Sequence, residues 1–156
     1  MFKKLTKWLY VALALTQLIT AGHVFGKNEL PGVQTSAESL VSIVINGQAM
    51  EVEYASTFAQ RSVGLMNRPA LCQQCGMLFK FANPKIASMW MKNTLIPLDV
   101  AFMRSDGVIT DIRALEPHDL TSIGSSEKVL YALEMNQGWF SQHKIAVGDK
   151  MHIKAQ

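Results

Sequence analysis

The dipeptide Asn46-Gly47 separates two runs of alternating, largely β-branched residues, Leu40–Ile45 and Gln48–Ala55. Asn-Gly between two such runs is the strongest short-range signal of a β-hairpin, because both turn residues must accept a positive φ. The part of the chain that begins at residue 40 is therefore predicted to start as an antiparallel hairpin.

Beyond this hairpin the pattern predicts one helix and several more short strands. Ser56 and Thr57 can cap a helix at residues 58–66, in which Phe58, Val63 and Met66 have the spacing of a buried face. Strands are predicted at residues 77–81, 86–91, 98–104, 108–115, 129–135 and 150–154, with a polar loop at 116–128 and a helical turn at 138–144. Strands and helices do not alternate regularly, which argues against a parallel sheet. We expect an α+β, mostly β domain, with an antiparallel sheet curled into a barrel-like shape and one or two short helices.

The first 26 residues have the pattern of an export signal. Three lysines precede an apolar run at residues 8–20, and Val24-Phe25-Gly26 suits cleavage before Lys27. The apolar run is shorter than the roughly 20 residues of a membrane span. An uncleaved N-terminal anchor is the alternative, and it would be the only membrane contact.

This pattern divides the chain into a signal peptide (1–26), a flexible lead-in (27–39) and a single β-rich domain (40–155). The protein is then expected to be exported, and to be periplasmic if its source is a bacterium with two membranes.

The charge of the chain argues against nucleic-acid binding. The sequence has 15 Lys and Arg and 12 Asp and Glu, and three of the lysines lie in the leader, so residues 27–156 are formally neutral. A nucleic-acid partner would need a basic surface that releases counterions from phosphates. No cluster of Lys and Arg follows residue 26, and we expect no nucleic-acid partner.

Cys72 and Cys75 are the only cysteines. In an exported protein we expect them to form a disulfide, which closes a very small loop and stabilises the fold by only about 2 kcal/mol. A redox-active pair is the alternative, but a thioredoxin-type pair lies at a helix N-terminus, whereas Gly76 and an apolar strand follow here.

We expect no metal ion and no cofactor. The cysteine pair would need two further ligands for a metal site, and His118, His143 and His152 are scattered and are interpreted as surface residues. The nine methionines could in principle bind Cu(I), but filling the core is their commoner use.

The segment Trp90-Met91-Lys92-Asn93-Thr94 runs from a predicted strand into a turn. It offers an ammonium group, an amide and a hydroxyl beside an indole, a combination that can bind a polar ligand. The alternative is a turn in which Asn93 and Thr94 bond only their own backbone.

Asp99 and Glu134 each lie inside an otherwise apolar strand, where a carboxylate is costly unless it has a partner. Lys92, Arg68 and Arg113 are the candidate partners. The two acids could form structural ion pairs or could do acid–base work, and the sequence does not give their separation. Neither a nucleophile elbow nor a His-based metal motif accompanies them.

Four motifs occur in the chain in the same order as in a known protein family. They are Gly64-Leu65-Met66-Asn67-Arg68, Gly76-Met77-Leu78-Phe79, Trp90-Met91-Lys92-Asn93-Thr94 with Pro97-Leu98-Asp99, and Ala132-Leu133-Glu134-Met135-Asn136-Gln137-Gly138-Trp139-Phe140. Over about residues 41–155 the chain resembles the domain of unknown function 192 (DUF192) family. The resemblance implies a compact, barrel-like β domain that is commonly exported in bacteria and has no settled activity. The cysteine pair lies where the family loop varies.

The family pattern points to polar and aromatic positions within these motifs. Trp90 is added because its indole lies next to Lys92, Asn93 and Thr94 in the sequence. The predicted ligand-binding residues are Arg68, Trp90, Lys92, Asn93, Thr94, Asp99, Glu134 and Trp139. We expect a monomer that binds a small polar, anionic or carbohydrate-like molecule, or an envelope partner, without catalysis. The alternatives are a hydrolase or transferase that uses Asp99 or Glu134 with Lys92, and a redox factor that uses Cys72 and Cys75.

Overall fold

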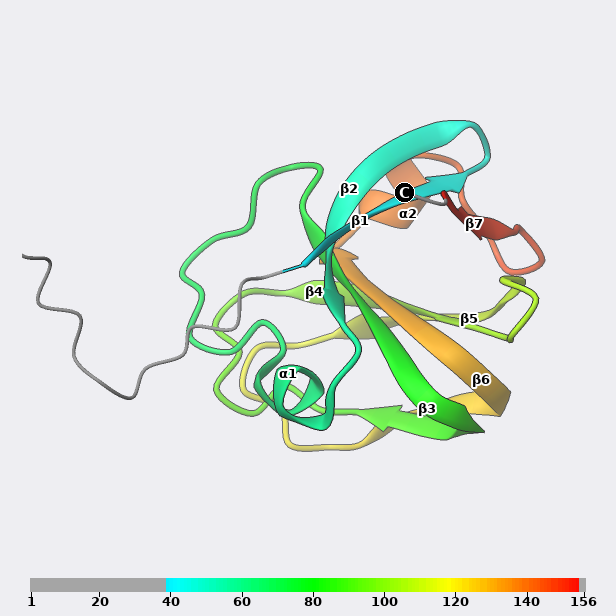
Figure 1. Ribbon diagram of the computed structural model, residues 1–156. Helices are drawn as coiled ribbons and strands as arrows, with labels where there is room; N and C mark the ends of the chain where they lie inside the picture. The colour runs from blue at the N-terminus through cyan, green and yellow to red at the C-terminus, as the bar shows by residue number, and fades with distance from the viewer. Residues whose placement is uncertain (1–38, 155–156) are drawn as a thin grey trace, which may run out of the picture. The chain divides into compact units, whose positions relative to one another are not determined.

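A computed structural model describes residues 39–154 of the chain (Figure 1). The predicted signal peptide (1–26) and residues 27–38 of the predicted lead-in lie outside the described residues. The elements, in chain order, are β1 (Leu40–Ile45), β2 (Gln48–Ala55), α1 (Phe58–Val63), β3 (Gly76–Met89), β4 (Leu98–Met103), β5 (Ile109–Leu115), β6 (Ile123–Asn136), α2 (Trp139–Gln142) and β7 (Met151–Ile153). No helix in the described part is long and apolar enough to span a membrane.

The predicted hairpin is confirmed. β1 and β2 pair antiparallel from Leu40 opposite Glu53 to Ile45 opposite Gln48. The turn between them has φ of 48° at Asn46 and 78° at Gly47, the positive values that Asn and Gly accept most readily.

The sheet is mostly antiparallel, as predicted, but it is mixed. Its strand order is β5-β4-β6-β3-β2-β1-β7, and the β2–β3 pair is parallel. The prediction was wrong for this pair because α1 and the loop after it return the chain to the end of the sheet at which β2 began. A parallel pair requires such a crossover.

Helix α1 is shorter and more exposed than the pattern predicted. A capping box starts it: the Thr57 hydroxyl accepts from the Gln60 amide, and the Gln60 side chain accepts from the Thr57 amide. The helix ends before Gly64, whose φ is 51°. Phe58 and Val63 are 81% and 60% exposed, so the predicted buried face is absent.

Strand β3 replaces two predicted strands, and β6 takes in part of a predicted loop. Pairing between β3 and β6 shifts register between Lys80 and Lys85, which accommodates Pro84 without ending the strand. Beyond this bulge, Met89 still pairs with Ile123, so residues from Ile123 onward are strand rather than loop. The bulge extends both strands well past their predicted ends.

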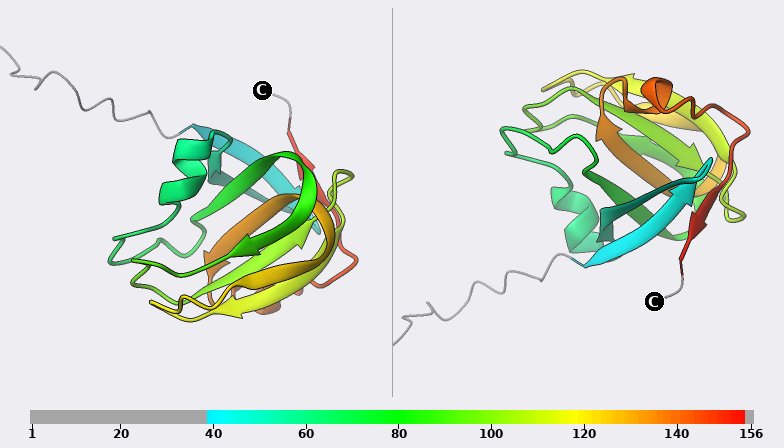
Figure 2. Two further views of the ribbon diagram at one scale, coloured as in Figure 1. Left: turned by 90° about the horizontal axis from the view of Figure 1, so that it is seen from below. Right: turned by 90° about the horizontal axis from the view of Figure 1, so that it is seen from above.

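The two edge strands of the sheet meet at one end, which curls it into a half-barrel (Figure 2). Val108, just before β5, forms a bridge with Lys150, just before β7. The Met151 amide donates to the Gly107 carbonyl at 2.9 Å, and the Ile109 amide donates to the Asp149 carbonyl at 2.8 Å. The predicted barrel-like α+β fold is therefore confirmed, with closure limited to this end.

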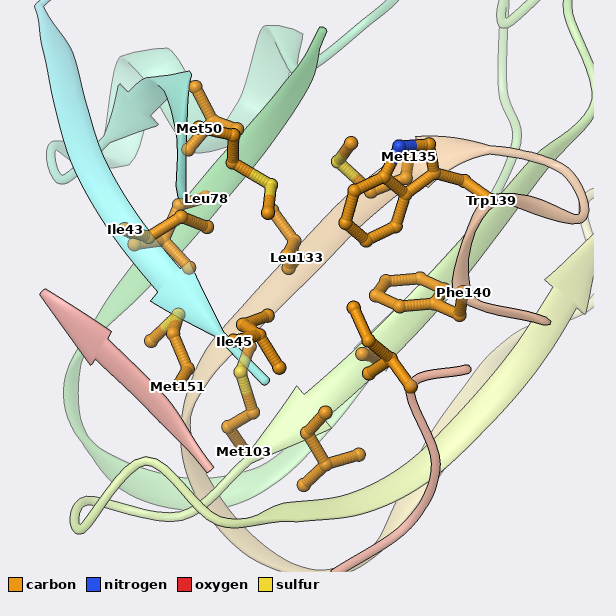
Figure 3. Packing of buried hydrophobic residues seen from close by; sticks show 14 of the residues in the cluster. Ile43, Ile45, Met50, Leu78, Met103, Leu133, Met135, Trp139, Phe140 and Met151 are labelled. Atoms are coloured by element: carbon orange, nitrogen blue, oxygen red, sulfur yellow. The ribbon is translucent and has the colours of Figure 1, made fainter. Parts of the chain in front are cut away.

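The sheet separates two hydrophobic clusters. The first cluster draws on every strand and on α2, and Figure 3 labels several of its residues: Ile43, Ile45, Met50, Leu78, Met103, Leu133, Met135, Trp139, Phe140 and Met151. The second cluster lies on the other face, and includes Leu65, Phe79, Phe81, Val100 and Ala132. Alternate residues of β4 and β6 enter different clusters, so these central strands are buried on both faces.

Substituting Gly107 by Ala tests the closure of the half-barrel. A Cβ at Gly107 would lie 2.2 Å from the Met151 carbonyl oxygen, whereas one at Gly47 has no atom within 4 Å. Both glycines have positive φ, +85° and +78°, so both variants carry the same conformational cost of about 1 kcal/mol. G107A should therefore lose about 1–3 kcal/mol more unfolding free energy than G47A, as measured by urea denaturation. Equal losses would mean that this contact does not support the fold.

Candidate functional site

A cavity of about 230 Å³ lies between α1, the residues that follow it and the sheet; we call it the α1 cavity. Leu65, Phe79 and Phe81 give it apolar walls, and Met66 and Met89 add thioethers. Residues from segments far apart in the chain meet here, because β3 runs beside β6 and the chain after β3 folds back toward α1.

Glu134 is the acidic residue of the lining. It lies opposite Met77 of β3 and Val100 of β4, so its strand neighbours on both sides are apolar. Glu134 is 4% exposed, and no described residue forms a hydrogen bond or ion pair with its carboxyl group. Burial raises the pKa of Glu134 from 4.5 to about 8, because the charged form loses its hydration. The carboxyl group is therefore mainly protonated at neutral pH and open to a partner.

Thr94 and Trp90 also line the α1 cavity. Thr94 is 5% exposed, and within residues 39–154 its hydroxyl forms only a long bond, 3.4 Å, to the Lys92 carbonyl. Trp90 is 54% exposed, and the Lys92 ammonium lies 5.5 Å from its ring centroid. These residues add a hydroxyl and an aromatic surface to the cavity.

A turn at residues 91–94 holds this side of the cavity. Asn93 has a φ of 55°, and its carbonyl accepts from the Asn67 amide at 2.8 Å. The Asn93 side-chain amide lies 4.0 Å from the Met66 sulfur. The turn is thereby fastened to the loop that follows α1. Lys92 and Asn93 belong to this turn but do not line the α1 cavity, whereas Thr94 does.

Asp99 lies on the opposite face of the sheet from Glu134. On the paired strands β4 and β6, Asp99 is opposite Met135 and Val100 is opposite Glu134. Directly opposed residues share a face, and successive residues alternate. Asp99 accepts from the Gly138 amide at 2.7 Å; burial raises the pKa of Asp99, and this hydrogen bond opposes the shift. The two acids cannot act as a pair on one substrate.

Trp139 belongs to a second hollow, of about 530 Å³, which is lined by none of the other predicted ligand-binding residues. Its indole N–H donates to the Gln74 side chain at 3.1 Å, and its ring stacks on His143 with centroids 4.2 Å apart. His143, predicted as a surface residue, is half-buried by this contact. His118 and His152 are exposed as expected.

Arg68 forms a bidentate ion pair with Glu53 of β2, and it does not line the α1 cavity. Arg113 pairs with Asp111, and Lys92 lies over Trp90. None of the three basic residues predicted as partners contacts Glu134, so that prediction was wrong. The ion pairs of Arg68 and Arg113 are formed with Glu53 and Asp111 instead, and the Lys92 ammonium lies over an indole ring.

Cys72 and Cys75 lie at disulfide distance, with their Cα atoms 5.0 Å apart. Their loop is held against β6 and α2, because the Asn136 amide donates to the Cys72 carbonyl at 2.8 Å and Gln74 accepts from Trp139. In the described residues no three His, Cys, Asp or Glu side chains gather as a metal site.

All four sequence motifs contribute residues to the lining of the α1 cavity, whereas only some of the predicted ligand-binding residues do. Its lining includes Gly64, Leu65 and Met66 of the first motif, Phe79 of the second, Trp90 and Thr94 of the third, and Glu134 of the fourth. Phe81, Lys85 and Arg61 were missed, because no local pattern links α1 to β3. Their membership depends on the long-range fold.

Comparison with known proteins identifies relatives over nearly the whole described domain. A model of the DUF192 family, described as an uncharacterized ACR, matches residues 41–153. A Sinorhizobium meliloti protein described as a candidate transcription regulator is 35% identical, with a TM-score of 0.71 over 74% of this chain and 95% of that one. A Novosphingobium aromaticivorans protein of unknown function is 32% identical, with a TM-score of 0.72 over 76% and 89%. No curated protein matches the chain.

Glu134 should make the fold less stable as the pH rises. Between the unfolded pKa of 4.5 and the folded value of about 8, the folded state holds a proton that the unfolded state has lost. The unfolding free energy should therefore fall by about 1.4 kcal/mol per pH unit in this range, to a total of at most about 5 kcal/mol. Chemical denaturation from pH 5 to 8 measures this slope.

The matched control is E134Q, which keeps the shape of the side chain and removes its titration. The slope should disappear in E134Q and persist in D99N, which makes the same change on the other face of the sheet. A slope that is unaltered in E134Q would assign the pH dependence to another group.

Proposed function

Because the chain belongs to the DUF192 family, which is described as uncharacterized, we propose its function from the site itself: the domain binds a small molecule in the α1 cavity, with Glu134 as the polar anchor. The observation that carries this proposal is a carboxyl group that is 4% exposed, lines a cavity and has no partner among the described residues. Among the described residues no fully buried side-chain oxygen lacks a partner, so the Glu134 oxygens still reach the cavity, where a ligand can bond to them.

The composition of the lining supports a small organic ligand. Binding sites for such molecules are mostly apolar and aromatic with a few polar groups that fix orientation. The α1 cavity follows this pattern, with Leu65, Phe79 and Phe81 on its walls and with Thr94 and Glu134 as polar groups. The convergence of four family motifs on the same lining gives independent support.

Binding is better supported than the catalytic alternative. Acid–base work by Asp99 and Glu134 together would need both carboxyl groups to face one substrate, and their cross-strand register gives them different faces. The redox alternative would need a reactive dithiol, whereas Cys72 and Cys75 lie at disulfide distance in a loop that is fastened to β6 and α2 and does not line the α1 cavity.

A thermal-shift screen of the full-length protein tests the proposed site. A ligand at 100 times its Kd should add about 2.7 kcal/mol to the unfolding free energy. Met89 is half-buried at the cavity, so M89W should fill space there and abolish the shift for every true hit. D99N, on the opposite face, should keep the shift. Hits that stabilise M89W as strongly as the parent protein would rule out the α1 cavity.

We also propose that the protein works after export, as the leader at residues 1–26 suggests. Expression in a bacterium with two membranes should yield a periplasmic protein whose measured mass begins at Lys27. A protein that keeps its leader and remains with the membrane fraction would support the uncleaved anchor instead.

A further inference from the structure

We infer that the ligand of the α1 cavity is a small organic amine, whose ammonium group pairs with Glu134 while its apolar body lies against the cavity walls. This inference rests on the proposed function and names the class of ligand. It starts from the polar groups that are buried in the lining, which are the Glu134 carboxyl and the Thr94 hydroxyl.

The partner that a desolvated carboxylate gains most from is a cation. Two opposite charges attract more strongly at the effective dielectric constant of such sites than in bulk water. The apolar strand neighbours Met77 and Val100 supply no such charge. The Thr94 hydroxyl, with its long bond of 3.4 Å, can accept a second hydrogen from an ammonium group.

The walls and the volume suit an aromatic or alkyl body. A dry cavity of about 150 Å³ is large enough to hold benzene. The α1 cavity, at about 230 Å³, has room for a ring and one polar group. Phe79 and Phe81 face this space, and aromatic faces attract cations as well as apolar groups.

Two lysines of the protein illustrate this chemistry on aromatic residues of the lining, Phe81 and Trp90. The Lys85 ammonium lies 4.7 Å from the Phe81 ring centroid, and the Lys92 ammonium lies 5.5 Å from that of Trp90. Lys85 and Arg61 are the basic residues of the lining, and Arg61 already donates to the carbonyls of Ser56 and Lys80. An anionic ligand could pair with Lys85, but it would meet the Glu134 carboxyl group in the same lining.

Isothermal titration of the full-length protein with benzylamine, benzyl alcohol and benzoate tests the inference. These probes share a ring and differ in the charge of the polar group. Benzylamine should bind at least tenfold more tightly than the other two. E134Q should weaken benzylamine by tenfold or more, should change benzyl alcohol by less than threefold, and D99N should change neither.

The pH dependence of binding provides a readout that a purely structural role for Glu134 would not alter. Pairing with an ammonium group needs the carboxylate form, and burial keeps the pKa of Glu134 at about 8. Benzylamine affinity should therefore rise nearly tenfold per pH unit from pH 6 to 7.5 in the parent protein and stay flat in E134Q. The other charged groups of the lining, Arg61 and Lys85, are the same in both proteins, as are Glu53 of β2 and Arg113 of β5 on the same face of the sheet.

The outcomes separate this inference from the proposed function. If benzyl alcohol or benzoate binds as tightly as benzylamine and M89W abolishes that binding, the cavity is a ligand site but its ligand class is wrong. If none of the three probes binds and the library screen gives no hit that M89W abolishes, both the inference and the proposed function are overturned.

Discussion

The alternation of side chains along β6 is the constraint on which the rest of the structure depends. β6 is paired on both sides, by β3 and β4, and it is buried on both faces, so Leu133 and Met135 enter one cluster while Ala132 enters the other. A slip of one residue would exchange the two faces and bury Glu134 among the first cluster. The packing of its apolar neighbours therefore fixes the carboxyl group in the α1 cavity, although the carboxyl group itself gains nothing there from the protein.

Asp111 and Glu134 are both buried acids, but their pKa values shift in opposite directions. Asp111 is 5% exposed, nearly as buried as Glu134, but its carboxylate accepts from Thr110, from the Ser126 amide and hydroxyl, and from Arg113. These bonds hold the pKa of Asp111 below its ordinary value despite the opposing effect of burial, whereas the pKa of Glu134 rises to about 8. The fold thus solvates one buried acid fully and leaves the other without a partner. Among the described residues, Asp111 is therefore held by its neighbours, whereas the Glu134 carboxyl group is positioned only by the strand that carries it.

Local patterns in the sequence predicted those parts of the fold that local chemistry determines. Asn46-Gly47 specified its hairpin, and Thr57 with Gln60 started α1. The parallel β2–β3 pair and the continuity of β3 through Pro84 depend on which strands meet, which no short window contains. For the same reason the predicted ligand-binding residues do not all lie together. Asp99 and Glu134 are on opposite faces because of a strand register that only the assembled sheet defines.

The α1 side of the cavity is held by fewer interactions than the side formed by β6. α1 is a six-residue helix that buries none of its residues, and a helix of this length is not stable by itself in water. Its position depends on the capping box and on hydrogen bonds from Arg61 to the carbonyls of Ser56 and Lys80. The β6 side, by contrast, belongs to a strand that is paired on both sides. The cavity thus combines a side held by a few local hydrogen bonds with a side whose position is set by the pairing of β6 with β3 and β4.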